Sequence, residues 1–267
     1  LKSVNIRAIP LYHEDYPCRL RECPDAPLLL YVAGQAMLNE GPVLSVVGTR
    51  KATPYGKSVC REIISGFKSL GIKPVIVSGL AFGIDITAHR AALENDMPTV
   101  AVLPTGIDIV YPSAHLDIAA QILECGAVLS EFPPKTQGHR HNFLRRNRII
   151  AGLADATLVV ESKVDGGAQI TAHLALGYSR DVLAVPGRPS DICSQGCNNL
   201  IRMNKAALVT SARDIADVLQ WEVRDKDIQA VQQKLFESLD DRDRQIINHI
   251  RENGGDINAM GESLNMP

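Results

Sequence analysis

The chain has 267 residues, a formal net charge of −2, and 45% hydrophobic and 22% charged residues. This composition is that of an ordinary globular protein; it excludes a uniformly basic nucleic-acid binder but permits a local basic patch. No apolar run approaches the roughly 18 residues of a transmembrane helix, and no signal-peptide pattern opens the chain, so we expect a cytoplasmic protein without membrane contact.

The N-terminal segment, residues 1–42, is interrupted by Pro17, Pro24 and Pro27 and contains one clear apolar run, Leu28–Val32. Proline has a fixed φ and no backbone N–H, so it disfavours long regular elements here. We therefore expect irregular chain with a strand or two, packed on the domain that follows.

Residues 43–220 alternate short apolar runs with amphipathic stretches. The runs are Val43–Val47, Val75–Ser78, Thr99–Leu103, Ala127–Ser130, Thr157–Glu161 and Val182–Val185, and the helical stretches lie near 56–70, 84–95, 113–125, 143–154 and 169–179. Runs that are apolar on both faces are typical of buried parallel strands. The alternation predicts an α/β fold with a doubly wound, mostly parallel sheet.

Residues 221–267 differ in composition from the sheet domain. The stretch 222–245 is rich in charges, and 229–266 reads as short helices broken at Gly254-Gly255. We expect a linker followed by a small helical module.

Two glycine-containing loops follow predicted strands and could hold an anion. Gly48 and Arg50 come directly after the first parallel strand, and Gly166 and Gly167 open the helix after the fifth. Ligands of doubly wound sheets bind beyond the carboxyl ends of the strands, where glycine allows close backbone approach and a helix N-terminus favours negative charge.

A basic window lies in another of these loops and in the helix that it opens. Between positions 135 and 148 the window has five Lys/Arg, two His and no acid; its candidate DNA-binding residues are Lys135, Arg140, Phe143, Arg145, Arg146 and Arg148. Guanidinium groups suit phosphate oxygens, and an aromatic ring offers a face for an unstacked base. This combination indicates a single-stranded nucleic-acid site.

Several alternative chemistries lack their motifs. The glycine after Gly48 is Gly56, so the dinucleotide fingerprint is absent, and Gly56-Lys57-Ser58 lacks the leading glycine of a phosphate-binding loop. The cysteine pairs have C-x4-C and C-x3-C spacing, which differs from the usual zinc pattern. We expect no catalytic set, no metal and no cofactor.

The chain resembles the DNA-processing protein A (DprA/Smf) family. The resemblance lies in Gly48-Thr49-Arg50, in Ser78–His89, in Gly106–Pro112, in Ser130–Pro133, in Arg146–Leu153, and in segments near 167–172, 184–187 and 196–201. It implies an extended Rossmann-like domain that binds single-stranded DNA, forms a homodimer through residues around 169–219, and loads RecA onto strands held by single-strand-binding protein during natural transformation. It also implies DNA contacts by Arg50, Phe143, Arg146, Asn147 and Arg148, and identifies 221–267 as a linker and truncated winged-helix-like module.

An enzyme remains the rival hypothesis. Rossmann-like nucleotide hydrolases of the lysine-decarboxylase-like type also place a glycine-rich phosphate loop after an apolar strand. Here Gly166-Gly167 lacks the preceding proline of that motif, and Gln169-Ile170-Thr171 stands where its glutamate would follow. We therefore favour a binding protein that is not an enzyme.

Overall fold

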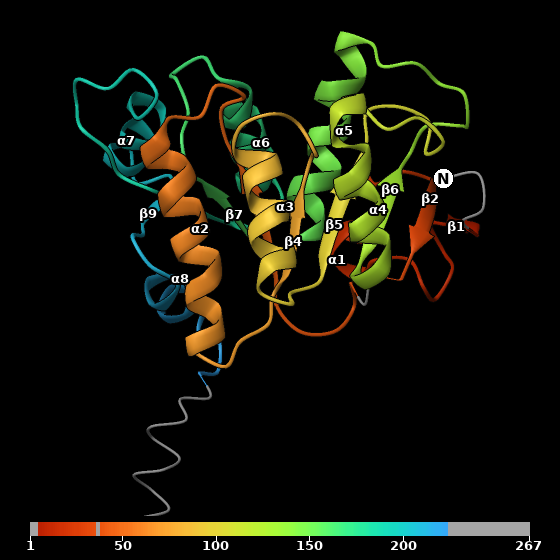
Figure 1. Ribbon diagram of the computed structural model, residues 1–267, viewed down its shortest axis with the longest axis horizontal. Helices are drawn as coiled ribbons and strands as arrows, with labels where there is room; N and C mark the ends of the chain where they lie inside the picture. Colours follow the sequence, from red (N-terminus) through yellow and green to blue (C-terminus); the bar gives the residue numbers. More distant parts are fainter. Residues whose placement is uncertain (1–4, 36–37, 224–267) are drawn as a thin grey trace, which may run out of the picture. The chain divides into compact units, whose positions relative to one another are not determined.

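The computed structural model describes residues 5–35 and 38–223. Within them a nine-stranded sheet has the order β1-β2-β6-β5-β4-β3-β7-β8-β9, and strands β3 to β9 are parallel (Figure 1). The predicted α/β, Rossmann-like, mostly parallel sheet is thus confirmed. In these parts of the chain no helix has both the length and the apolar character needed to cross a membrane.

Six of the seven parallel strands coincide with the predicted apolar runs to within a residue or two, whereas the two-residue strand β9 was not predicted. They are β3 (Val43–Val47), β4 (Val75–Ser78), β5 (Thr99–Val102), β6 (Ala127–Ser130), β7 (Ala156–Val159), β8 (Asp181–Ala184) and β9 (Ala207–Leu208). Every residue of β3 to β7 is buried, as expected for strands covered on both faces. The run Thr157–Glu161 extended too far, because Glu161 lies beyond β7 and accepts hydrogen bonds from Thr53.

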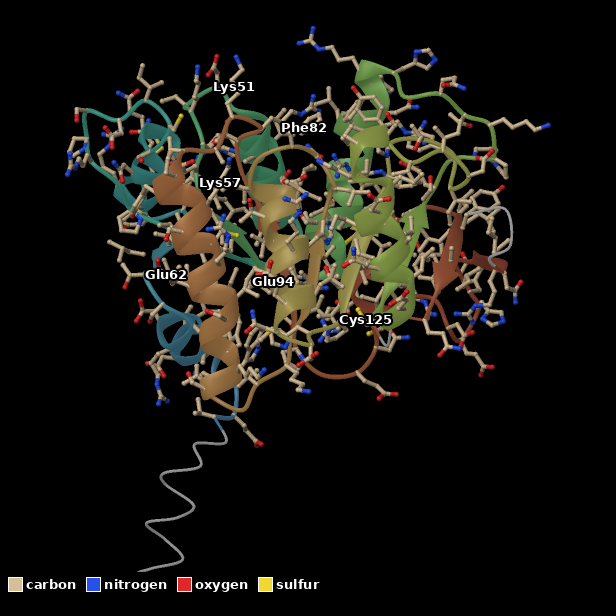
Figure 2. All side chains as sticks on the ribbon, viewed as in Figure 1. Lys51, Lys57, Glu62, Phe82, Glu94 and Cys125 are labelled. Carbon is tan, nitrogen blue, oxygen red and sulfur yellow. The ribbon has the colours of Figure 1, made fainter. Side chains whose placement is uncertain are left out.

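Helices cover the sheet in two layers. On one face lie α2 (Pro54–Ser69), α3 (Ile84–Glu94), the short turn η1 (Ser113–His115) with α4 (Leu116–Cys125), and α8 (Ala212–Leu219). On the other lie α1 (Cys18–Arg21), α5 (Arg140–Leu153), α6 (Gly167–Gly177) and α7 (Gln195–Arg202). Figure 2 shows Lys51, Lys57 and Phe82 toward the end of the first layer where α2 and α3 begin, with Glu62 and Glu94 further along these helices.

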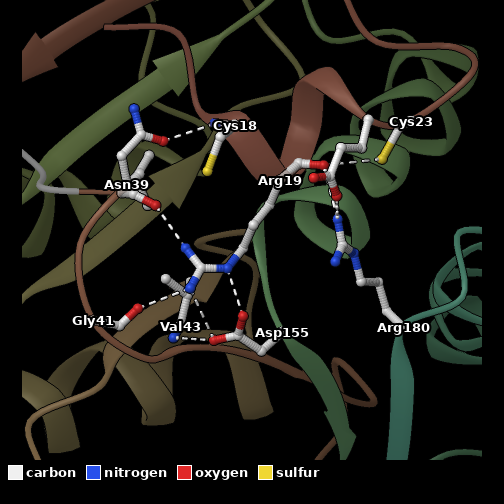
Figure 3. Close-up of polar contacts among 10 residues, drawn as sticks. Cys18, Arg19, Cys23, Asn39, Gly41, Val43, Asp155 and Arg180 are labelled. Carbon is white, nitrogen blue, oxygen red and sulfur yellow. Dashed lines mark hydrogen bonds and ion pairs between the residues drawn. The ribbon is translucent and has the colours of Figure 1, made fainter.

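The N-terminal segment extends the sheet by two strands, and through α1 it also packs on one face. Strand β1 (Ile6–Pro10) pairs antiparallel with β2 (Leu29–Gly34), and β2 pairs antiparallel with β6. The segment is also tied to the start of β3: Arg19 donates to Asp155 at 2.5 Å and to the carbonyl of Gly41 at 2.8 Å, and Asp155 accepts the backbone N–H of Val43 (Figure 3). Backbone pairing and this ion pair together fix the edge of the sheet.

The chain after α8 continues into the core for a few residues. Trp221 lies against Phe67 with 5.9 Å between ring centroids, and Val223 packs against the same cluster. The predicted helical module of 221–267 falls, from residue 224 onward, outside the described residues.

Candidate nucleic-acid interface

A pocket opens where the sheet changes winding direction. The chain runs from β3 outward through β4, β5 and β6, then returns to the other side of β3 as β7, so the carboxyl ends of β3 and β7 lie side by side. Such a switch point is the usual ligand site of doubly wound sheets. The pocket found there, called the switch-point pocket below, has a volume of about 590 Å³.

The loop that carries Arg50 is held on both sides. The Thr49 N–H donates to the carbonyl of Glu161 at 2.8 Å, and the Thr49 carbonyl accepts from Ile84 N–H at 3.2 Å. Gly83 has φ +81°, and a Cβ there would overlap the carbonyl of Thr49, so only glycine permits this approach. Arg50 therefore projects from a fixed backbone.

Arg50 stacks on the ring of Phe143, which in turn contacts Tyr111. Its guanidinium carbon lies 4.9 Å from the centroid of the Phe143 ring, and Tyr111 meets Phe143 edge-on with centroids 5.4 Å apart. Tyr111 remains 45% exposed, so the stack is open to solvent. It offers a cation beside an aromatic face, the arrangement that suits a phosphate next to a base.

Helix α5 divides the basic window into two sets. The first turn of α5 projects beyond the carboxyl ends of the strands (Figure 1). Residues three, four and seven positions apart along this helix share a face. The face toward the switch-point pocket presents Arg140, Phe143, Leu144, Arg146, Asn147 and Ile150.

Arg145 and Arg148, which the sequence predicts to bind DNA, lie on the other side of α5 and do not line the pocket. Both arginines donate hydrogen bonds to the carboxylate of Glu131, and the Arg145 bond measures 3.0 Å. Arg148 also donates to the backbone carbonyl of Asp25. The Glu131 side chain is only 4% exposed. Because a buried carboxylate needs a partner, both arginines are engaged by Glu131, and Arg148 in addition ties α5 to the N-terminal segment.

Lys135 also lies outside the pocket lining. It is exposed, with φ +67°, and its backbone N–H donates to Asp108 Oδ1 at 2.8 Å. The turn is thus held by its backbone, and the ammonium group points to no described partner.

Arg146 lines the inner part of the pocket and is almost fully buried. Its Nη1 donates to the carbonyl of Val102 at 3.3 Å, and a Cβ at Gly79 would overlap its guanidinium. Burial lowers the pKa of Arg146 to about 10. Burial raises the pKa of the neighbouring Asp85 carboxyl, and the positive charge of Arg146 opposes this rise. Within the described residues Arg146 Nε is buried and has no hydrogen-bond partner.

The second glycine loop lies on the pocket. Gly166 and Gly167 both line it, and a Cβ at Gly167 would meet nothing within 4 Å, so the start of α6 is accessible to a ligand. Sequence reasoning missed Lys163, which lines the pocket from the same loop, and did not assign Tyr111. The available signal for Lys163 was a lysine in the loop between β7, which ends at Val159, and the glycines that open α6.

The comparisons with known proteins agree on one family. Residues 7–220 match the family described as DNA recombination-mediator protein A. The chain is 42% identical to the DNA processing protein DprA of Streptococcus pneumoniae over 200 residues, covering 75% of this chain and 70% of the relative. It is 39% identical to the protein Smf of Escherichia coli over 222 residues, covering 83% and 59%. Two relatives from Mycobacterium tuberculosis are 43% identical, and the match spans about half, 51%, of their length.

Solved structures of the same family share the fold. The X-ray structure of DprA from Streptococcus pneumoniae superposes with a TM-score of 0.74 at 40% identity, covering 80% of this chain and 74% of that one. DprA from Helicobacter pylori, whose structure concerns its single-stranded DNA binding mode, gives 0.72 at 26% identity, covering 83% and 99%. The sheet, its switch-point pocket and these matches together place the chain in the DNA recombination-mediator protein A family.

Proposed function

We propose that the chain binds single-stranded DNA in the switch-point pocket and acts as a recombination mediator. The observation that carries this proposal is the convergence of four cations, Arg50, Arg140, Arg146 and Lys163, with the Tyr111–Phe143 pair around one pocket that contains a single carboxylate, Asp85. The side chains that line the pocket carry a formal charge of about +3 (four cations minus one acid), which favours binding of a polyanion.

The shape of the site favours a single strand over a duplex. A volume of about 590 Å³ is typical of pockets that enclose one small ligand group. An unpaired base can leave its neighbours and enter such a pocket, whereas a base in a duplex must first be unstacked at a cost of a few kcal/mol. The single-stranded DNA binding of the Helicobacter pylori relative supports the same choice.

The finer role follows from membership of the family. We propose that the chain takes part in loading RecA onto incoming strands held by single-strand-binding protein during natural transformation. A homodimer through the region around 169–219 is part of this proposal, and the exposed apolar side chains of Ile170, Ile192, Met203 and Leu208 support it. Leu174, Leu176 and Tyr178 of the same region pack against the core instead. Sedimentation showing only monomers at micromolar concentration would reject the dimer.

We further propose that the chain acts by binding and not by catalysis. The rival, a nucleotide hydrolase, has one observation in its favour: Asp85 faces the pocket, and burial raises its pKa. A nucleoside-monophosphate hydrolysis assay separates the two, because turnover that Asp85→Asn abolishes would establish an enzyme.

The direct test compares oligo-dT with duplex DNA of equal length at two salt concentrations, about 50 and 200 mM. We expect tighter binding of the single strand at both, and weaker binding of each at higher salt. Removing Arg140 and Lys163 together should weaken binding of the single strand. Equal affinity for duplex would contradict the role of the aromatic pair and leave a general basic patch.

A further inference from the structure

A second basic groove lies next to the switch-point pocket, between helices α2 and α3. It has a volume of about 610 Å³, and five cations line it, Arg50, Lys51, Lys57, Arg61 and Arg90, against one carboxylate, Glu94. Figure 2 shows Lys51, Lys57 and Phe82 at this end of the two helices and Glu94 further along α3. We call it the α2–α3 groove.

Four cations of the α2–α3 groove form no ion pair in the described part of the chain. In residues 5–35 and 38–223 no ion pair within 4.0 Å involves Lys51, Lys57, Arg61 or Arg90, whereas Lys68 near the end of α2 pairs with Asp96 at 3.7 Å. Lys57 and Arg61 are also four positions apart on one helix, a spacing at which like charges destabilise the helix. A cluster of five cations with one carboxylate, four of them outside any ion pair, is suited to an external anion.

An aromatic side chain stands in the same groove. Phe82 is 51% exposed and packs edge-on against the His115 ring with 4.7 Å between centroids. A half-exposed phenylalanine among cations repeats the chemistry of the Arg50–Phe143 stack.

Arg50 joins the two cavities, because it lines both of them. The loop that carries it is hydrogen-bonded to the start of α3, so the pocket and the groove are built on one connected piece of backbone. We propose that the α2–α3 groove binds the sugar-phosphate backbone of the strand whose base occupies the switch-point pocket, so that one single strand runs from the pocket past Arg50 along α2 and α3. This inference rests on the proposed function, since it concerns the same strand. Continuity through Arg50 and the presence of Phe82 favour nucleic acid over an acidic protein segment.

The test measures binding of fluorescent oligo-dT of two lengths, about 4 and about 16 nucleotides, the range of single-strand sites. The groove variant is Lys57→Ala, Arg61→Ala, Arg90→Ala. The matched control removes three lysines that line neither cavity: Lys68→Ala, Lys73→Ala, Lys205→Ala. A pocket variant, Arg140→Ala, Lys163→Ala, reports on the proposed function.

We expect the groove variant to bind the short oligonucleotide normally and the long one more weakly. With a slope of about 0.7 per phosphate on a single strand, three lost contacts flatten the salt dependence by about 2. The ratio of wild-type to variant affinity for the long strand should then be about 20-fold larger at 50 mM than at 200 mM salt. The control should keep the wild-type slope.

Two outcomes overturn the proposal. In the first, the groove variant binds the long strand with wild-type affinity and salt slope, which would leave the groove to another acidic ligand. In the second, the groove variant loses the same affinity for both oligonucleotide lengths. Failure of the proposed function differs, since the pocket variant would then bind both lengths like wild type. If the groove variant does not fold by circular dichroism, Arg61→Gln, Arg90→Gln, which changes only two exposed side chains, repeats the measurement.

Discussion

Arg148→Ala should lower the stability of the protein without changing its salt-dependent binding of DNA. The Glu131 carboxylate, 4% exposed, accepts from Arg148, which is 13% exposed, and from Arg145, which is 47% exposed. Removing one partner of a buried ion pair costs about 3–5 kcal/mol. Because Arg145 remains beside Glu131, we expect the lower end, about 3 kcal/mol.

Urea denaturation measures this loss. With a urea dependence of about 1–3 kcal/mol per molar, the unfolding midpoint should fall by about 1–3 M. Oligo-dT binding by the folded variant, titrated with salt, should keep the wild-type slope, because Arg148 does not line the switch-point pocket. Stability and binding thus separate in one variant.

Two further variants sharpen the result. Arg145→Ala should cost no more than about 1 kcal/mol, as for an exposed ion pair. Glu131→Gln, Arg148→Met should recover most of the stability, since replacing both members of a buried pair is often neutral. The reasoning is refuted if Arg148→Ala unfolds at the wild-type urea concentration and its salt slope is flatter by about 0.7, because Arg148 would then hold a phosphate.

Three other perturbations follow from the structure. Arg50→Ala should flatten the salt slope for oligo-dT by about 0.7, with Arg50→Lys recovering part of the affinity, as measured by fluorescence anisotropy. Gly79→Ala should displace Arg146 and reduce both binding and the urea midpoint, whereas Gly177→Ala, with nothing within 4 Å of the added methyl, should leave both nearly unchanged or slightly improved. Backbone and side-chain donors of Thr210 and Ser211 lower the pKa of Asp214 in the folded state. Its contribution to stability is therefore full above the ordinary value of 3.8 and lost as the pH falls below it, so the wild type should lose more stability between pH 5 and 3 than Asp214→Asn does, as measured by urea unfolding.

Hydrophobic patterning was sufficient to predict strands β3 to β8 of the sheet, but not the two-residue strand β9. Buried parallel strands must be apolar on both faces, so each apolar run marked a strand, and the Gly48 and Gly166-Gly167 loops followed from the strand ends. The sequence did not predict that β1 and β2 form the edge of the sheet, because this depends on backbone pairing of β2 with β6, almost a hundred residues away in the chain.

The basic window shows where sequence reasoning stopped. The sequence identified its charges, and a 3.6-residue period separates Arg145 and Arg148 from the face that contains Arg140, Phe143 and Asn147. Which face meets the pocket and which meets Glu131 depended on how α5 docks on the sheet. The same holds for Lys51, Lys57, Arg61 and Arg90, which are separate in sequence and form one groove only because α2 and α3 pack side by side. Local periodicity determines the elements and their faces, whereas the charges that act together are decided by contacts between elements far apart in the chain.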